Sequence, residues 1–67
     1  MSIGKVSEIS STSKISFEDA VNQGLQRAQK TLRNVRSAWI KEQQIRVREG
    51  AIKEYQVNLM VTFVVDD

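Results

Sequence analysis

An indole and three carboxamides in the C-terminal half of the sequence could together recognise a planar ligand. Trp39 has a flat face for stacking, and Gln43, Gln56 and Asn58 each carry one acceptor and two donors in a plane. These groups suit a heterocycle whose edge alternates carbonyl and N–H groups, as the edge of a flavin does. The same residues also suit a contact between subunits, with Trp39 as an interface anchor and Gln56 as a satisfied polar group. Their types and spacing leave both interpretations open.

Catalytic chemistry has little support in the composition. The sequence lacks histidine, the commonest general base and metal ligand, and it lacks cysteine and any glycine-rich phosphate loop. Glu42, Glu49 and Glu54 have simpler roles as charges on strands or in a turn. We therefore expect no enzymatic activity, no catalytic residue and no metal site. Asp66 and Asp67 would gather a divalent cation only if symmetry brought copies of the chain together.

Charge and hydropathy argue against nucleic-acid and membrane partners. Ten Lys and Arg residues against eight Asp and Glu residues give a net charge of +2. The chain has no apolar run long enough to span a bilayer and no charged-then-apolar leader. We expect a cytoplasmic protein that binds neither membranes nor nucleic acid, and a small basic nucleic-acid binder is the remaining alternative. Cations recur every three residues at Arg27, Lys30, Arg33 and Arg36. Each step of three residues turns a helix by about 300°, so these side chains do not form a single basic stripe.

The elements that position these residues follow the order βαββ in one domain, residues 1–67. Ser16 is a good N-cap for a helix that begins at Phe17 and ends near residues 34–36. One apolar stripe indicates that this helix lies on a sheet, and it consists of Phe17, Val21, Leu25, Ala28, Leu32 and Val35. Strands are predicted at residues 4–10, 37–47 and 53–65, with a polar turn at 10–16 and a tight turn at Glu49–Gly50.

The two-residue turn sets a register for the last two strands. The odd-numbered residues from Tyr55 to Val65 then form the core under the helix, and the indole gathers with the amides on the other face. Glu42 would lie opposite Val57 on the helix side, which is costly for a charged group. The expected pairs are Trp39 with Met60, Lys41 with Asn58, and Gln43 with Gln56.

A chain of this size needs additional stabilisation. A domain of 67 residues buries only about 60% of the surface that its unfolded chain exposes. Without cysteine it cannot form disulfides, so oligomerisation is the remaining common solution. The face away from the helix would present Trp39, Ile45, Met60 and Val64, which is too much apolar surface to leave in water.

The sequence as a whole resembles the dodecins, which are small flavin-binding proteins. The resemblance covers nearly the whole chain, through the segments KVSEISSTS, SFEDAVNQGLQRAQKTLRNVR and EYQVNLMVTFVVDD. It implies an α+β fold, βαββ, with a three-stranded antiparallel sheet packed around one helix. It further implies assembly into a hollow homododecamer whose sheets line the inside, and a role in storing or sequestering a flavin.

The resemblance also implies where the flavin would bind. In flavin-binding members a Trp early in the second strand stacks on the isoalloxazine ring, and a Gln in the third strand, matched by Gln56, bonds its pyrimidine edge. Those members carry Asp-Trp-Phe where this chain has Arg36-Ser37-Ala38, so Trp39 lies two residues further along the same strand face. Arg36 suits a phosphate and favours FMN over riboflavin. The implied cofactor-binding residues are Trp39, Gln56, Ser37, Arg36 and Gln43, and the alternative is a structural or ion-binding shell without flavin.

Overall fold

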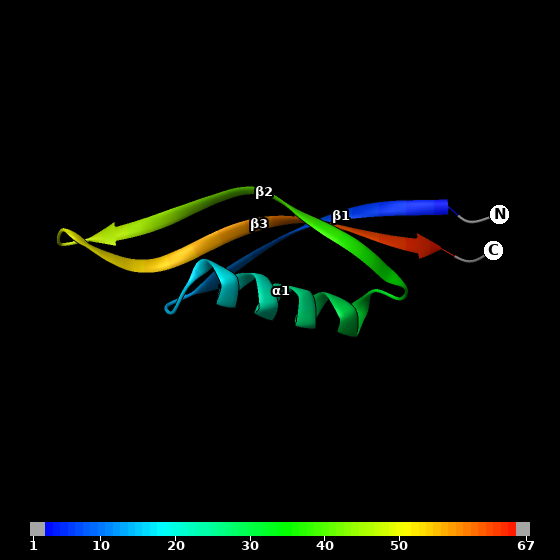
Figure 1. Ribbon diagram of the computed structural model, residues 1–67, viewed down its shortest axis with the longest axis horizontal. Helices are drawn as coiled ribbons and strands as arrows, with labels where there is room; N and C mark the ends of the chain where they lie inside the picture. The colour runs from blue at the N-terminus through cyan, green and yellow to red at the C-terminus, as the bar shows by residue number, and fades with distance from the viewer. Residues whose placement is uncertain (1–2, 66–67) are drawn as a thin grey trace.

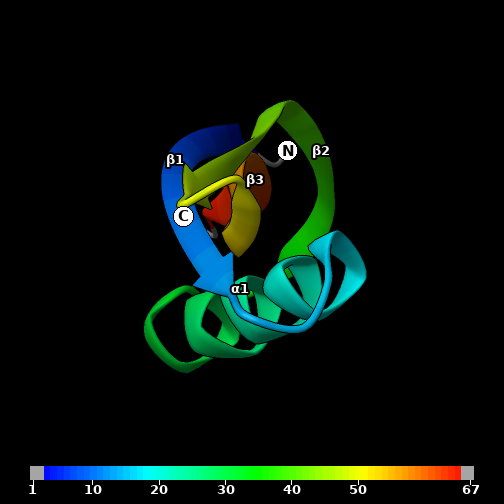
Figure 2. The ribbon, with the colours of Figure 1, turned by 90° about the vertical axis from the view of Figure 1, so that its left-hand side faces the viewer.

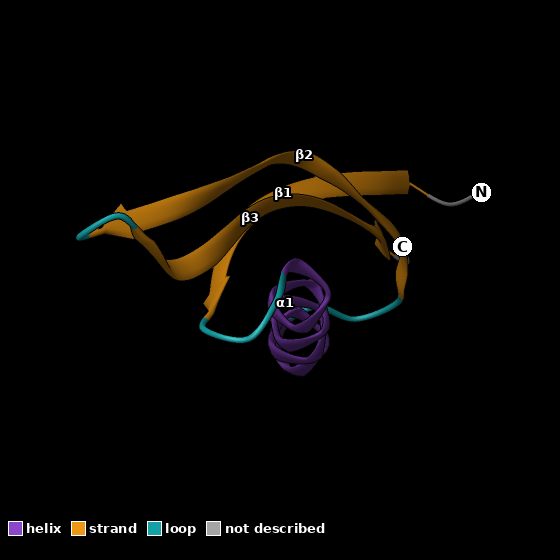
Figure 3. Cartoon of the chain, turned by 60° about the vertical axis from the view of Figure 1, so that its left-hand side comes forward, coloured by secondary structure: helices purple, strands orange, loops and turns teal. Residues whose placement is uncertain are grey.

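The computed structural model describes residues 3–65, which fold in the predicted order βαββ (Figure 1). The three strands form one antiparallel sheet in the order β1-β3-β2, so the C-terminal strand is central. The sheet arches over a single helix (Figure 3). The predicted α+β fold class is confirmed. The elements are β1 (Ile3–Ser13), α1 (Phe17–Thr31), β2 (Val35–Arg48) and β3 (Ala51–Val65).

The helix begins where its cap predicts and ends earlier than expected. Ser16 is extended, and its side chain accepts a hydrogen bond of 3.0 Å from the backbone N–H of Asp19, so Phe17 is the first helical residue. Leu32 is already extended, and the predicted end at residues 34–36 is therefore wrong. Asn34 adopts φ 59°, a left-handed conformation that lets the chain reverse into β2 within three residues.

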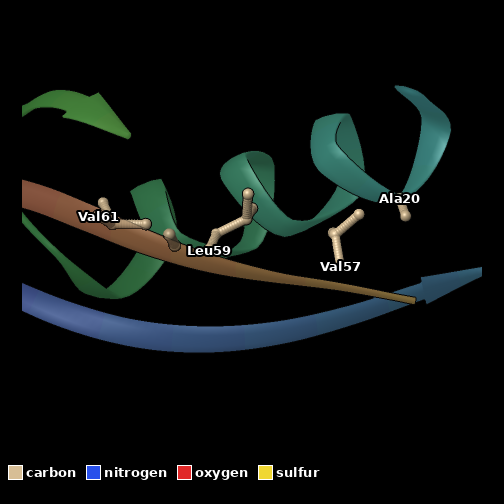
Figure 4. Packing of buried hydrophobic residues seen from close by; sticks show 5 residues of the cluster. Ala20, Val57, Leu59 and Val61 are labelled. Atoms are coloured by element: carbon tan, nitrogen blue, oxygen red, sulfur yellow. The ribbon is translucent and has the colours of Figure 1, made fainter. Parts of the chain in front are cut away.

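Small residues form the line of contact between α1 and the sheet. Ala20, Gly24 and Ala28, spaced four residues apart, are the buried residues of the helix. They lie over Val57, Leu59 and Val61 of β3 (Figure 4). The larger members of the predicted stripe flank this line and are only partly buried, namely Phe17, Val21, Leu25, Leu32 and Val35. The helix therefore approaches the sheet more closely than a stripe of large side chains would allow.

The strand β1 is longer than predicted because the serine-rich segment belongs to it. Ser13 is buried, its hydroxyl donates to Oδ2 of Asp19 at 2.6 Å, and it accepts a bond from the Ile15 backbone N–H at 2.9 Å. These hydrogen bonds satisfy the buried hydroxyl of Ser13, which would bond to water in a solvent-exposed turn. The predicted turn at residues 10–16 is thus shortened to 14–16.

The turn between β2 and β3 is confirmed, but the register beyond it is only partly so. Glu49 and Gly50 have φ 53° and 79°, the positive values typical of a type I′ hairpin turn. One irregularity between Arg46 and Val47 adds a residue to β3, and a second between Ile40 and Glu42 adds one to β2. Trp39 does pair with Met60 as predicted. The expected pairs Lys41 with Asn58 and Gln43 with Gln56 are wrong, since the observed pairs are Glu42 with Asn58 and Gln44 with Gln56.

The charge of Glu42 accounts for the one-residue shift in the pairing of β2 with β3 between the two irregularities. In the predicted register Glu42 lies opposite Val57, which is fully buried beneath the helix. In the observed register it lies opposite Asn58, whose side-chain amide donates a short hydrogen bond to Glu42 Oε1. The shift therefore keeps a carboxylate out of the core.

Replacement of Gly24 tests the close contact between helix and sheet. A Cβ at this position would lie 3.1 Å from both Leu59 Cδ1 and Ser11 Cβ. Overpacking costs about 1–3 kcal/mol, whereas Gly→Ala within a helix gains about 1 kcal/mol. We expect Gly24→Ala to lower the free energy of unfolding by about 1 kcal/mol, measured by denaturant unfolding followed by circular dichroism. Gln26→Ala, at an exposed helix position, is the control and should not be destabilising; equal stability of the two variants would contradict the close contact.

Candidate functional site

The open face of the sheet is the side that turns away from α1. In the view along the long axis, β1 and β2 curve to either side of β3 while α1 lies on the opposite side of the sheet (Figure 2). On β3 the open face carries Glu54, Gln56, Asn58, Met60 and Thr62, which alternate with the core residues. Their partners on this face are Val6, Glu8, Ser10 and Thr12 from β1, and Ser37, Trp39, Glu42, Gln44 and Arg46 from β2.

Trp39 provides the aromatic surface of the open face. It lies on β2 opposite Met60, and Glu8 of β1 lies on the other side of Met60. Lys41 Nζ is 3.4 Å from both carboxylate oxygens of Glu8, so an ion pair crosses the sheet beside the indole. With 52% of its surface exposed, Trp39 is accessible to a planar ligand.

Gln56 is held in place by residues from both neighbouring strands. Arg46 Nη2 donates to Gln56 Oε1 at 2.6 Å, and Gln56 Nε2 donates to Ser10 Oγ at 3.0 Å. Arg46 Nε also lies 3.4 Å from Glu54 Oε1. A carboxamide has two N–H donors and two lone pairs, so these bonds use half of its capacity. Gln56 is therefore oriented in advance and still able to bond a ligand.

The indole and this carboxamide share a face but are not neighbours. Met60, which pairs with Trp39, is four residues from Gln56 on β3, a separation of about 13 Å along the strand. Asn58 lies between them and is bonded to Glu42. One ligand that contacts both Trp39 and Gln56 of the same chain must lie along β3 over Asn58, and otherwise the two contacts come from different chains.

The remaining predicted site residues fall in different places. Ser37 pairs with Thr62 and joins Trp39 on the open face. Arg36 is exposed and is the additional residue at an irregularity between Val35 and Ser37, at the end of β2 far from Gln56. Gln43 pairs with Val57 and belongs to the helix side of the sheet, so it does not join Gln56.

Sequence reasoning missed the residues that surround Gln56. Gln44 takes the position expected for Gln43, while Arg46 and Ser10 provide the two bonds to the carboxamide. The unfavourable position of Glu42 in the predicted register was the available signal. When a predicted register places a charged residue opposite a core valine, a β-bulge that shifts the register is a better explanation than a buried carboxylate.

Neither a cluster of metal ligands nor a helix able to cross a membrane occurs within residues 3–65. Residues 3–65 contain no group of three or more His, Cys, Asp or Glu side chains arranged to hold a metal ion. Asp66 and Asp67, the acidic pair of the sequence, lie outside the described residues. The helix α1 is not long and apolar enough to cross a membrane, and the described part of the chain has no other helix.

Comparisons with known proteins agree on one family. The family model of the dodecins matches residues 3–66. A crystal structure of a mutant of Thermus thermophilus dodecin is 36% identical, covers 100% of both chains and has a TM-score of 0.93. Dodecin from Streptomyces davaonensis is 29% identical over 98% of this chain and 97% of that chain, with a TM-score of 0.92. Streptomyces coelicolor dodecin, at 24% identity and a TM-score of 0.93, covers 98% of this chain and 94% of that chain and supports the fold alone. The curated proteins gave no match.

Engineered cysteine pairs test the corrected register next to Gln56. Directly opposed residues of antiparallel strands have Cα atoms about 4.5–5.5 Å apart, within the reach of a disulfide. We expect Gln44→Cys combined with Gln56→Cys to oxidise to an intrachain disulfide, detected by mass spectrometry with and without reductant. The chain has no cysteine of its own, so no other thiol competes. Gln43→Cys with Gln56→Cys is the control and should remain reduced, and the reverse result would restore the register expected from the turn alone.

Proposed function

The chain belongs to the dodecin family, and we propose that it is a non-enzymatic protein that binds and sequesters a flavin on the open face of its sheet. The observation that carries this proposal is Trp39, a half-exposed indole on the same face of the sheet as the carboxamides of Asn58 and Gln56. This arrangement provides a surface for stacking and planar donors and acceptors for a heterocycle edge. The direct test is a titration of the purified protein with FMN and riboflavin, followed by flavin absorption and fluorescence.

Stacking on Trp39 gives the proposal its physical consequence. An indole against the isoalloxazine ring quenches the excited state of the flavin and so limits its photochemistry. Binding in this mode needs no proton transfer and no covalent step, which fits a chain without histidine or cysteine. Storage and protection of the flavin follow from stacking alone.

The position of Trp39 shifts the proposed site relative to that of other flavin-binding dodecins. By the resemblance to flavin-binding dodecins Ser37 takes the place of the family Trp, and Trp39 lies two residues, about 6–7 Å, further along β2. The shift runs toward the end of the sheet that holds Gln56, because Ser37 pairs with Thr62 and Trp39 pairs with Met60. A ring stacked on Trp39 therefore lies closer to Gln56 of the same chain than one stacked at the position of Ser37.

Self-assembly is part of the proposal. The resemblance to the dodecins implies a homododecamer, and a shell of this kind would bring open faces of several copies together. Met60 adds apolar area beside Trp39, and Val6, which is exposed on β1 opposite Thr62, adds more on the far side of this face. A neighbouring copy that approaches this surface would exclude water from the stacked ring and complete the site.

A shell without flavin is the second candidate, and two observations favour it. Ser37 cannot stack on a ring, and Gln56 already bonds Arg46 and Ser10 within its own chain. In this alternative Trp39 is an anchor between subunits, and the open face binds other copies of the chain.

Substitution of Trp39 separates the two candidates. If a flavin stacks on the indole, Trp39→Ala should weaken binding by about 1–3 kcal/mol, by analogy with bases stacked on aromatic side chains, and should restore the fluorescence of the bound flavin. Trp39→Phe should retain part of the stacking energy and part of the fluorescence quenching. Fluorescence titration gives the dissociation constant and the quenching in one experiment.

Gln56→Ala is the companion variant in the same titration. It should cost about 1–3 kcal/mol by leaving polar atoms of the ring unpaired, and quenching by Trp39 should persist in the bound fraction. Neither variant should abolish assembly, because the core under α1 is untouched. A wild-type chain that binds no flavin at micromolar concentration, together with a Trp39→Ala variant that dissociates, would establish the second candidate instead.

Arg36 tests the proposed preference for FMN. A guanidinium binds a phosphate in a bidentate manner that a ribityl hydroxyl cannot match. We expect the wild-type chain to bind FMN more tightly than riboflavin, and Arg36→Ala to remove this difference, roughly tenfold in dissociation constant, without changing riboflavin binding. Arg33→Ala, a nearby exposed cation, is the control. Equal affinities for the two flavins in the wild type would exclude the phosphate contact.

A further inference from the structure

One end of the β2–β3 hairpin extends beyond the rest of the molecule. The strand β1 ends at Ser13, opposite Tyr55, so the preceding residues of β3 have only β2 beside them. We call residues 46–54 the arm, which comprises the turn and the strand ends that it joins. In Figure 1 the arm projects past the N-terminal end of α1. A two-stranded hairpin by itself is marginally stable in water.

The two sides of the arm differ in polarity. Val47 pairs with Ile52, and these side chains are 62% and 51% exposed. Both side chains lie on the side of the sheet that carries α1. Val47 is two residues from Ile45 and therefore points to the same side, and Ile45 pairs with Tyr55. The ring of Tyr55 contacts Phe17 of α1, with 5.0 Å between the ring centroids. The other side of the arm carries the ion pair of Arg46 with Glu54.

The apolar side of the arm continues along the bare side of β2. The helix packs on β1 and β3, and Ile40 and Ile45, on the helix side of β2, are both exposed. The expected position of Ile45 on the open face is wrong, because the shifted register pairs it with Tyr55. We call this surface the β2 row. It contains no charged residue, so two copies of the chain can face each other across it without repulsion. Its members are Ile40, Gln43, Ile45 and Val47 of β2, with Ile52 of β3.

The chain exposes more surface and is more extended than a compact monomer of its mass. Its accessible surface is 5032 Å², whereas a compact monomer of 7.6 kDa has about 4300 Å². Its radius of gyration is 13.8 Å, against about 11 Å for a compact chain of this length. The excess, on the order of 700 Å², is close to the roughly 800 Å² that one partner contributes to a standard interface. The chain has the shape of one part of an assembly.

We propose that the β2 row, and above all Val47 and Ile52 of the arm, docks against a second copy of this chain. This proposal rests on the self-assembly included in the proposed function and assigns that assembly to a surface. The row lies on the helix side of the sheet, while Trp39 and Gln56 lie on the open face. Docking through the β2 row therefore leaves Trp39 and Gln56 uncovered, so substitution of either residue tests flavin binding without altering the docking surface.

Native mass spectrometry and sedimentation of two charge-matched variants test the docking surface. Val47→Glu and Arg48→Gln each change the charge by −1 at adjacent positions of β2, but only Val47 lies in the β2 row. We expect Val47→Glu to raise the dissociation concentration of the assembly at least tenfold, with the helical circular dichroism retained. Arg48→Gln should assemble like the wild type. A Val47→Glu variant with the mass and dissociation concentration of the wild type would overturn the proposal.

A second variant covers the case in which Val47→Glu does not fold. Val47→Thr keeps the shape and the strand preference of the side chain and replaces one methyl group by a hydroxyl. It should assemble measurably more weakly than the wild type, and unchanged assembly would overturn the proposal. A wild-type chain that is monomeric would overturn it as well.

Flavin titration of the same samples separates this proposal from the proposed function. A wild-type assembly that binds no flavin, together with a Val47→Glu variant that dissociates, would support docking through the arm and contradict the flavin role. Flavin binding by an assembly that Val47→Glu does not weaken would support the flavin role and contradict docking through the arm.

Discussion

The close approach of α1 to the central strand is the contact on which the rest of the structure depends. Because Ala20, Gly24 and Ala28 are small, the helix lies directly over Val57 to Val61 and closes a narrow core. A single helix seated on β3 and β1 leaves the helix side of β2 uncovered beyond Val35. The same contact that stabilises the core thus leaves exposed the apolar surface that we propose as the docking site for a second copy.

Local signals in the sequence were sufficient for the start of the helix and for the hairpin turn, because a cap and a type I′ turn are each decided by a few adjacent residues. The register was harder, since it also depends on where Glu42 can be tolerated. The irregularities add one residue to β3 and then one to β2, so they cancel by the time the strand reaches Trp39. This cancellation explains why the Trp39–Met60 pair was predicted correctly from an incorrect register, whereas the partner of Gln56 was not.

In the candidate site, too, the sequence predicted the face of the sheet on which a residue lies but not the residues that it contacts. Alternation along a strand was enough to assign Trp39, Ser37 and Gln56 to one face, because side-chain direction has a period of two. It could not reveal that Arg46 and Ser10 hold Gln56, since those contacts join three strands and one of them depends on a bulge. The end of α1 was misjudged for a related reason: Leu32 and Val35 continue the apolar pattern and pack on the core, but they do so from extended backbone.

The two sides of the sheet differ in the kind of contact they can make, and this difference constrains how an assembly could work. The β2 row has no charge and suits the removal of water over a broad area, which favours permanent association. The open face mixes one indole with bonded amides and two ion pairs, which suits the recognition of a polar planar molecule that must also leave. Subunit contacts through the row would hold the open faces at fixed positions regardless of whether they are occupied. A shell built in this way could release its ligand without coming apart, which the proposed storage role would require.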